Sequence, residues 1–325
     1  MKLAKPFVKL PFTFDHERLA AEISQFGEEQ WRPHPSGLEG NSSLVLVSTN
    51  GEDNDDFIGP MKATARLEKT PYIRQIMAQF DSVVGRSRLM RLAPGAAVTQ
   101  HTDAHYFWRN HLRIHVPIIT DPAVAFYCED EEVHMAAGES WTFDNWRFHS
   151  VENRSEITRI HLVIDTVGSG ELWKMINGAG LEPERVNFRE EHAPELRFES
   201  YRGLPVMPST ELRGDLEQLL GDIAEDRVSD TQMKEQLRAR SADFLHDWHS
   251  HWMVHGPTAA GMPGYTDLRD AFRKDIESLP DHLALESNGY SFKHAVLYTL
   301  DAALNPRNIR EEAVSGAPAV STSTG

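Results

Sequence analysis

Short, turn-separated segments of alternating apolar and polar residues fill the chain from about residue 88 to residue 166. The predicted strands are residues 89–92, 97–103, 112–118, 124–127, 132–135, 140–143 and 157–166, with turns at Pro94-Gly95 and Gly138. The pattern contains no clear helix between these strands. Such a run predicts an antiparallel sandwich or barrel, of which the double-stranded jelly roll is one form.

Histidines and a carboxylate recur within these strands, and seven of the chain's 16 histidines lie in residues 101–161. His101 and Asp103 are two residues apart, so on a strand their side chains point to the same face. His149 completes a triangle with them if the sheet folds back. Two histidines and a carboxylate form the facial triad that holds Fe(II) and leaves positions open for co-substrate and oxygen. We therefore predict His101, Asp103 and His149 as metal ligands, although His-x-Asp alone is a weak signal that packing also explains.

Arginine and histidine alternate with apolar residues on two further predicted strands. Arg159 and His161 share a face of strand 157–166, so both would point into the barrel. A buried arginine is costly unless it is paired. Arg159 therefore either forms a salt bridge with a protein carboxylate or grips the distal carboxylate of 2-oxoglutarate. Arg113 and His115 are either a satisfied polar pair or further donors to 2-oxoglutarate or to the metal's outer ligand sphere.

These residues together resemble the aspartyl/asparaginyl β-hydroxylase family, which includes free-proline hydroxylases. The matching residues are Pro94-Gly95, His101-Thr102-Asp103, Arg113-Ile114-His115, Gly138-Glu139-Ser140-Trp141, Asp144, His149-Ser150 and Arg159. The resemblance covers roughly residues 40–168. It implies a double-stranded β-helix that uses Fe(II), 2-oxoglutarate and O₂. His101, Asp103 and His149 would bind iron, and Arg159 would bind the C5 carboxylate of 2-oxoglutarate with Arg113 and His115 assisting.

Asp103 bears on the position of the chain within this family. The endoplasmic-reticulum enzymes that hydroxylate EGF-like domains carry glycine in place of the carboxylate ligand, so the chain more closely resembles the bacterial amino-acid hydroxylases. The implied activity is hydroxylation of an unactivated C–H of an amino acid or of an aspartyl, asparaginyl or prolyl side chain, with succinate and CO₂ as co-products. The alternatives are a non-catalytic cupin-like metal-binding or sensor protein, and a dioxygenase that catalyses desaturation or cyclisation.

The segment that follows Asp103 is the candidate substrate-binding loop. Tyr106 and Trp108 would shape a pocket there, and Arg109 would pair with a substrate carboxylate. The equally weighted alternative is that the aromatic residues cover barrel hydrophobics and that Arg109 is solvated. The substrate is predicted to be a small-molecule amino acid or a peptide- or carrier-bound residue.

Bulk composition excludes several classes of partner. The formal net charge of −16 argues against nucleic acid and against an anionic membrane surface. The single cysteine, Cys128, permits no intrachain disulfide and is expected to be a small buried side chain. No apolar run approaches a membrane span, and the N-terminus lacks a signal-peptide pattern. A reducing, cytoplasmic location is predicted, which also suits Fe(II).

The predicted fold class is a mainly β catalytic core, a double-stranded β-helix of jelly-roll or cupin-like form, with flanking N-terminal helices and an α-helical C-terminal region. Residues 1–168 form the dioxygenase domain, beginning with an edge strand or extended arm over residues 1–14. One helix follows an Asp15 cap; a second, capped by Thr70, carries an apolar stripe as far as Val83. Residues 169–312 form the helical region, and residues 313–325 form a disordered tail.

The C-terminal region contains no catalytic motif. Its helices would pack on the barrel, form a homodimer interface or dock a carrier or peptide, and the sequence does not choose among these. His251 and His255 are four residues apart on a predicted helix face. We favour structural or surface roles for them over a second metal site, because the segment lacks the His-Glu-x-x-His pattern.

Overall fold

The computed structural model describes residues 2–34, 37–178, 182–201, 203–225 and 228–305. The chain divides into two compact units. The first, here called the β unit, comprises residues 1–103 and 107–201, and the second, the helical unit, comprises residues 104–106 and 202–325. The predicted boundary at residue 168 thus falls inside the β unit. The predicted disordered tail, residues 313–325, lies outside the described residues.

The described part of the β unit contains two sheets. The larger sheet has nine strands in the order β13-β1-β10-β7-β12-β5-β3-β2, with β4 on β3. Its strands are β1 (Phe7–Phe14), β2 (Arg32–Pro33), β3 (Asn41–Thr49), β4 (Met61–Ala63), β5 (Val83–Leu92), β7 (Leu112–Ile119), β10 (Glu139–Phe143), β12 (Arg159–Gly168) and β13 (Glu184–Val186). The smaller sheet has the order β6-β11-β8-β9, formed by β6 (Ala97–His101), β11 (His149–Asn153), β8 (Val124–Cys128) and β9 (Glu131–Val133).

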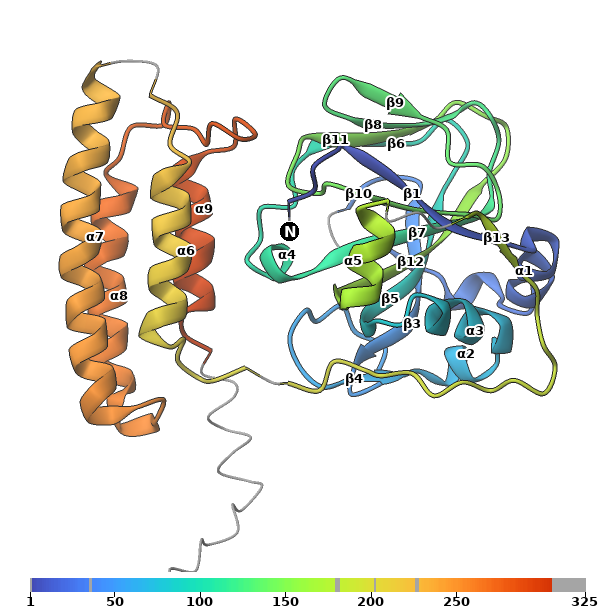
Figure 1. Ribbon diagram of the computed structural model, residues 1–325, viewed down its shortest axis with the longest axis horizontal. Helices are drawn as coiled ribbons and strands as arrows, with labels where there is room; N and C mark the ends of the chain where they lie inside the picture. Colours follow the sequence, from blue (N-terminus) through green and yellow to red (C-terminus); the bar gives the residue numbers. More distant parts are fainter. Residues whose placement is uncertain (1, 35–36, 179–181, 202, 226–227, 306–325) are drawn as a thin grey trace, which may run out of the picture. The chain divides into compact units, whose positions relative to one another are not determined.

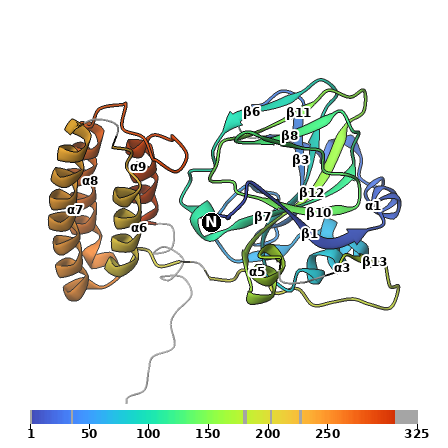
Figure 2. The same cartoon turned by 45° about the horizontal axis from the view of Figure 1, so that its top comes forward.

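The chain passes back and forth between these sheets. Strands β5, β7, β10 and β12 belong to the larger sheet, whereas β6, β8 and β11, which lie between them in sequence, belong to the smaller one. Figures 1 and 2 show the smaller sheet facing the larger one. This alternation with antiparallel pairing is the double-stranded β-helix, or jelly roll, so the predicted fold class is confirmed.

Each face of the larger sheet has its own apolar core. The outer face is covered by α1 (His16–Ile23), α2 (Ala65–Glu68), α3 (Pro71–Gln79) and α5 (Gly170–Ile176), whose Leu19, Leu67, Ile73 and Leu172 pack with sheet residues such as Ile114. The inner face packs on the smaller sheet through Phe7, Leu92, Phe126, Phe143 and Val151. The inner core is interrupted by histidine and arginine side chains, which form the site described below.

Several local predictions need correction. Residues 1–14 do not form an edge strand, because β1 pairs with β10 on one side and with β13 on the other. Thr70 precedes α3, but its hydroxyl donates to the carbonyls of Arg66 and Leu67 at the end of α2. The cap of α3 is instead Glu22, whose carboxylate accepts from the backbone N–H groups of Tyr72 and Ile73. Helix α3 ends at Gln79, so Val83 begins β5.

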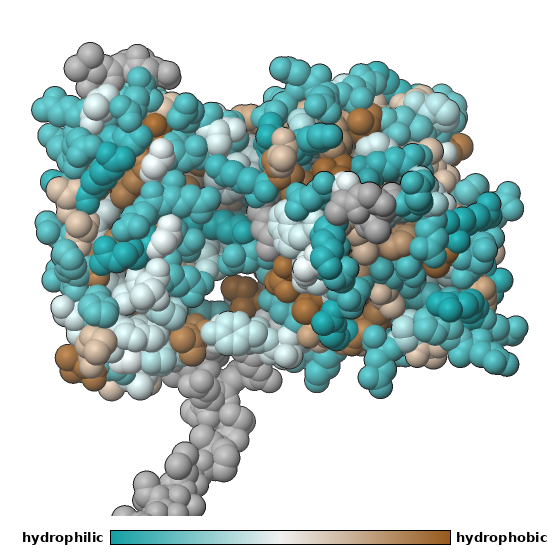
Figure 3. Space-filling model, viewed as in Figure 1, coloured by the Kyte–Doolittle hydropathy of each residue, from teal (hydrophilic) through white to brown (hydrophobic). Residues whose placement is uncertain are grey.

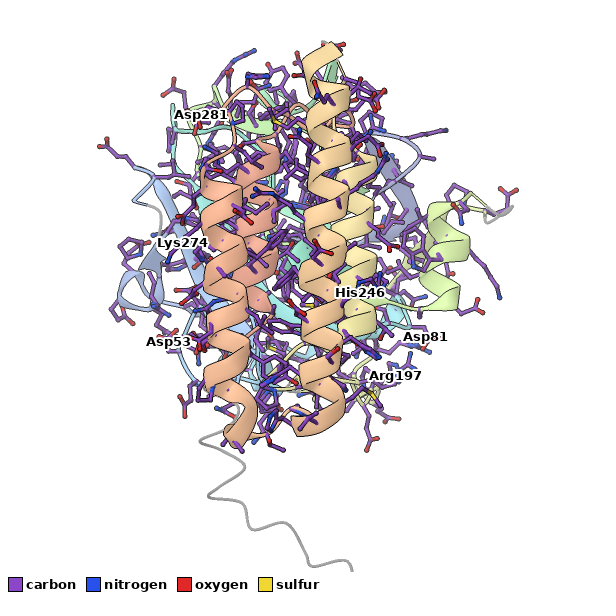
Figure 4. The ribbon with its side chains drawn as sticks, turned by 90° about the vertical axis from the view of Figure 1, so that its left-hand side faces the viewer. Asp53, Asp81, Arg197, His246, Lys274 and Asp281 are labelled. Atoms are coloured by element: carbon purple, nitrogen blue, oxygen red, sulfur yellow. The ribbon has the colours of Figure 1, made fainter. Side chains whose placement is uncertain are left out.

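The segment after β12 belongs to the β unit because its backbone forms hydrogen bonds with strand β5. Residue Val84 donates its N–H to the carbonyl of Arg197 at 2.7 Å, and Glu199 donates to the carbonyl of Val84 at 3.0 Å. The Arg197 guanidinium also pairs with Asp81 at 2.8 Å (Figure 4). These hydrogen bonds and this ion pair explain why the unit extends to Tyr201 and not only to the end of β12.

The helical unit contains α6 (Ser209–Gly221), α7 (Val228–His255), α8 (Met262–Glu277) and α9 (Phe292–Ala302), as predicted. Its interior includes Trp248, Tyr265, Phe272 and Leu300. In the view of Figure 3 its surface is mostly hydrophilic, with apolar residues in small separate groups. None of the described helices is both long enough and apolar enough to cross a membrane. The pairing of this unit with a second copy stays a prediction.

Asn153 fastens the strand that carries His149 to the start of the strand that carries Arg159. Its amide Nδ2 donates to the carbonyls of Leu92, Ala93 and Ile157 at 3.0, 3.0 and 2.8 Å. Its Oδ1 accepts from the backbone N–H and the hydroxyl of Ser155. The side chain is 1% exposed, so water cannot replace these bonds.

We expect Asn153→Ala to lower the free energy of unfolding of the β unit by roughly 3 kcal/mol, because several buried polar groups lose their partners. Urea titration followed by tryptophan fluorescence measures the change. The matched control is Glu152→Ala, which removes only an exposed pair with Arg154 and should change stability by less than about 0.5 kcal/mol. Equal effects of the two substitutions would contradict this role of Asn153.

Candidate metal centre

His101 and His149 face each other across the two antiparallel strands β6 and β11. They are directly opposite in register, and their ring centroids are 4.2 Å apart. Opposed residues of an antiparallel pair point to the same face. Asp103 follows two residues after His101, with its Oδ1 3.9 Å from His101 Nε2. Ligand atoms of His101, Asp103 and His149 all lie within 4.8 Å of one another, which is the only such group of three or more among the described residues.

Hydrogen bonds orient both histidines for metal binding. The Nδ1 of His101 lies 2.8 Å from the carbonyl of Thr99, and the Nδ1 of His149 lies 2.9 Å from that of Arg147. A carbonyl only accepts, so each Nδ1 carries the proton and each Nε2 keeps its lone pair. Burial also lowers the pKa of His149 to about 4. His149 is therefore held as a neutral imidazole, the form that ligates a metal.

The turn before His149 is fixed by buried polar contacts. The Asp144 carboxylate accepts from the backbone N–H groups of Leu3 and Trp146 and from Arg147 Nε. The backbone carbonyl of Asn145 accepts from the backbone N–H of Asp103 at 3.0 Å. The side-chain Nδ2 of Asn145 lies 3.5 Å from Asp103 Oδ2. This turn therefore positions the carboxylate ligand as well as His149.

Arg113 lies beside the carboxylate ligand and is held by a second carboxylate. Its Nε and Nη2 donate to the two oxygens of Asp165 at 2.8 and 3.3 Å, and its Nη1 is 3.9 Å from Asp103 Oδ2. Burial alone would raise the pKa of Asp165, but Arg113 and Arg86 hold that pKa below its usual range. The partner of Arg113 is thus Asp165, whereas the polar pair proposed from the sequence was Arg113 with His115. The part of Arg113 in cofactor binding stays a prediction.

Arg159 is buried without a carboxylate. Its Nη2 donates to His161 Nδ1 at 2.8 Å, and His161 Nδ1 is 3.4 Å from His115 Nδ1. Burial lowers the pKa of Arg159 to about 9. Burial and the positive charge of Arg159 also lower the pKa values of His115 and His161. No described acidic residue pairs with Arg159. Three buried nitrogens of this cluster have no hydrogen-bond partner: Arg159 Nε, His115 Nε2 and His161 Nε2.

The three residues predicted to bind substrate, Tyr106, Trp108 and Arg109, lie in different environments. Trp108, on α4 (Phe107–Asn110), lies under Arg113, whose guanidinium carbon is 4.3 Å from the ring centroid. Arg109 lies on the same short helix and is half-buried. Tyr106 clusters with the helical unit, where its hydroxyl donates to Glu211. Of the three residues, Trp108 has the contact that links it to the metal centre, and the roles of Arg109 and Tyr106 stay predictions.

The sequence reasoning missed three charged residues on the inner face. Arg86 and Arg88 lie on β5, where Arg88 is opposite Val163 of β12. Asp165 follows two residues after Val163 and is 1% exposed. The signal was present, because Arg159, His161, Val163 and Asp165 alternate along one strand. The strand predicted here covered only residues 89–92, whereas β5 begins at Val83, so both arginines lay outside the predicted strand.

A cavity of about 690 Å³ opens at the β2–β3 edge of the β unit. Its lining includes Trp31, His34, Asn41 and Thr158 but none of the three candidate ligands. Burial and then the charges of Arg88 and Arg113 lower the pKa of His34 to about 4, so His34 lies near these arginines. The cavity has the volume of a small-molecule site, but its lining includes none of Arg86, Arg88 and Arg113.

The remaining candidates have structural surroundings. His251 Nε2 bonds the carbonyl of Gly261 at 2.9 Å, His249 bonds Ser209, and His246 is exposed on α7 (Figure 4). These histidines form no metal-binding group among the described residues. Cys128 is fully buried opposite His149, and burial raises the pKa of its thiol to about 12. It is therefore a small apolar side chain, as expected.

Fold and site together define a jelly roll with a candidate two-histidine, one-carboxylate metal centre. Residues 19–168 match the model of the family described as aspartyl/asparaginyl beta-hydroxylase. The chain is 28% identical over 160 residues to L-proline cis-4-hydroxylase of Rhizobium meliloti (strain 1021), covering 47% of this chain and 57% of that protein. It is 29% identical over 176 residues to L-proline cis-3-hydroxylase 1 of Streptomyces sp, covering 48% and 58%. The match of residues 19–168 to this family model, together with these relatives, confirms the predicted resemblance.

The chain thus spans less than two thirds of the length of these curated relatives. Solved structures with a limited likeness include a 2OG-Fe(II) oxygenase family oxidoreductase from Burkholderia pseudomallei, with a TM-score of 0.36, 12% identity and coverage of 51% of this chain and 87% of that one. A Pseudomonas putida prolyl-4-hydroxylase gives a TM-score of 0.35 with 14% identity, covering 51% and 95%.

We expect His101→Ala or His149→Ala to weaken Fe(II) or Co(II) binding by more than roughly 100-fold. Loss of a residue that only hydrogen-bonds to a metal ligand costs roughly 10- to 100-fold, and loss of the ligand itself should cost more. Anaerobic calorimetric titration of the metal-free protein measures the affinity. His251→Ala and His255→Ala are matched controls from the helical unit and should leave the affinity unchanged. Undiminished metal binding after replacement of both His101 and His149 would rule out this centre.

Acid should destabilise the metal-free protein through the buried histidines that do not ligate metal. His34, His115 and His161 have pKa values lowered by burial, whereas in the unfolded chain they titrate near about 6.5. Below that pH the unfolded state binds more protons than the folded state. The free energy of unfolding is therefore greatest above about pH 6.5 and falls as the pH decreases toward 4, by up to about 1.4 kcal/mol per pH unit for each histidine. Urea titrations at several pH values measure this slope. His161→Gln should reduce the slope, and a slope unchanged by it would contradict the assignment.

Proposed function

We propose that the β unit is an Fe(II)/2-oxoglutarate-dependent dioxygenase that hydroxylates an unactivated C–H of an amino acid. His101, Asp103 and His149 would hold the iron. Bound Fe(II), with 2-oxoglutarate and O₂, supplies oxidative chemistry that yields succinate and CO₂ while one oxygen atom enters the substrate. The family assignment supports this proposal, and two of the matching relatives are L-proline hydroxylases.

The buried, carboxylate-free Arg159 is the observation that carries the proposal. A guanidinium inside a protein needs an acceptor, and a bound carboxylate is the acceptor that its fork of N–H groups fits best. His161 accepts from one arm of Arg159, which leaves Nε free to donate. The C5 carboxylate of 2-oxoglutarate would receive that donor, and the unpartnered ring nitrogens of His115 and His161 lie in the same cluster.

The chain's own residues would hold protons and exclude water. His115 and His161 remain neutral because burial lowers their pKa values, so they act as hydrogen-bonding groups without adding charge beside Arg159. Phe126 and Phe143 pack against His115, with ring centroids 5.6 and 5.5 Å away, and Phe143 also contacts His149 at 4.8 Å. These rings keep the region between the Arg159 cluster and the metal ligands apolar.

The alternative function is a non-catalytic cupin-like metal-binding or sensor protein. Such a protein has no need for a buried arginine that lacks an internal counterion, so Arg159 favours the dioxygenase. Desaturation or cyclisation would use the same cofactors, and product analysis separates them from hydroxylation. A reducing, cytoplasmic setting is part of the proposal because Fe(II) persists there.

We expect the wild-type protein, loaded anaerobically with Fe(II) and 2-oxoglutarate, to develop a weak visible charge-transfer band. Arg159→Ala should raise the dissociation constant for 2-oxoglutarate by at least about 30-fold, as expected when a buried charge pair loses one partner. Band titration measures this constant, and the affinity for Fe(II) alone serves as the control that should not change. Metal binding without any band in the wild type would favour the non-catalytic alternative.

A further inference from the structure

Asp55 and Arg88 face each other on the inner side of the β unit without satisfying each other. Arg88 Nη1 lies 3.6 Å from Asp55 Oδ1, which is longer than a hydrogen bond. Asp55 Oδ1 is buried and has no hydrogen-bond partner. Among the described residues the Arg88 guanidinium has no hydrogen-bond acceptor, and its one ion-pair partner is Asp55. One unsatisfied anion and one unsatisfied cation are therefore adjacent.

The neighbouring charges already have their own partners. Asp165 accepts from Arg113 and lies 3.5 Å from Arg86 Nε. The second oxygen of Asp55, Oδ2, pairs with Arg32 at 3.1 Å. What remains is Asp55 Oδ1, which needs a donor, and Arg88, which needs an acceptor. An α-amino acid in its zwitterionic form offers both on adjacent atoms.

We propose that Arg88 binds the α-carboxylate and Asp55 the α-ammonium group of a free amino acid, which makes Asp55 a determinant of substrate class. This inference rests on the proposed hydroxylase function and deepens it. A residue inside a peptide carries neither charge at its α-carbon, and a carrier-bound amino acid has lost its carboxylate. The pair therefore selects the free amino acid over peptide- and carrier-bound substrates.

The pair is on the same inner face as the metal centre. Arg88 of β5 and His115 of β7 are both paired in register with Val163 of the central strand β12. Their Cα atoms are therefore two strand spacings, about 10 Å, apart. Arg113 extends from the row beside them to within 3.9 Å of Asp103. A small amino acid held at Arg88 would thus direct its side-chain carbons along this face toward the candidate ligands.

The β3–β4 loop that carries Asp55 is fastened at several points. Asp53, labelled in Figure 4, pairs with Arg32 and Arg66. The carbonyl of Asp55 accepts from Arg86 Nη1 at 3.2 Å. Phe57 stacks under Arg86, with the guanidinium carbon 3.9 Å from its ring centroid, and also contacts Phe107. These contacts hold the Asp55 carboxylate toward the inner face, which a substrate-binding group requires.

The experiment measures succinate formation by the Fe(II)- and 2-oxoglutarate-loaded full chain with each free proteinogenic amino acid. The amino acid that stimulates most is then compared with its N-acetyl and C-amide forms. We expect blocking of either end to lower kcat/KM by at least about 10-fold, the cost of a lost charge-assisted hydrogen bond. Binding of the same compounds to the Ni(II)-substituted protein, measured by calorimetry, gives a readout independent of turnover.

Asp55→Asn is the test variant, and Glu52→Gln, at an exposed position of the same loop, is its control. We expect Asp55→Asn to raise KM for the free amino acid about 10- to 100-fold and to leave KM for 2-oxoglutarate within about 2-fold. Its affinity for the N-acetyl form should not change, because that form has no ammonium group to lose. Glu52→Gln should affect none of these values.

The outcomes separate the inference from the proposed function. Absence of the charge-transfer band in the wild type overturns both. A normal band with stimulation by the N-acetyl form or by peptides, but not by free amino acids, overturns the inference alone. Equal effects of Asp55→Asn and Glu52→Gln, or equal losses for free and N-acetyl forms after Asp55→Asn, show that Asp55 only supports the loop and also overturn the inference.

Discussion

Buried positive charge on the inner face of the larger sheet is the constraint on which the β unit depends. Arg86, Arg88, Arg113 and Arg159 are all less than one-fifth exposed, and a guanidinium inside a protein is costly without an acceptor. Asp165 compensates two of them. Arg159 has no carboxylate among the described residues, and Arg88 has only a distant one. This imbalance is the physical basis for assigning both to the carboxylates of bound molecules.

The metal centre depends in turn on strand register. His101 and His149 meet because they are opposite each other in β6 and β11, and a slip of one residue would turn a histidine to the other face. The register is supported at both ends of β11, by Asp144 in the turn before it and by Asn153 at its end. Gly138 has a φ of +81°, and a Cβ there would lie 2.3 Å from the carbonyl of Phe14, so the turn into β10 requires glycine.

Most of the strands and the three candidate ligands that the structure brings together were predictable, because period-two alternation and side-chain chemistry are both local properties. His101 and Asp103 share a face on any strand, and so do Arg159 and His161. Strand β11 was missed because the few residues from His149 to Asn153 show little apolar alternation, although burial in the sheet makes them a strand. Strand β13 and the boundary at residue 201 were missed because they depend on pairing with β1 and β5, which are far away in sequence.

The sequence by itself determined which residues are candidates for the chemistry and which face of its strand each occupies, since neighbouring side chains alternate in direction whatever surrounds them. Only the tertiary structure decided which buried charges are compensated. Arg113 and Arg159 both stand in an Arg-Ile-His sequence, yet Arg113 meets Asp165, 52 residues away, and Arg159 meets a histidine. That difference follows from which strands are neighbours and in what register, because an ion pair forms between atoms that are close in space, and the linear pattern does not contain that distance.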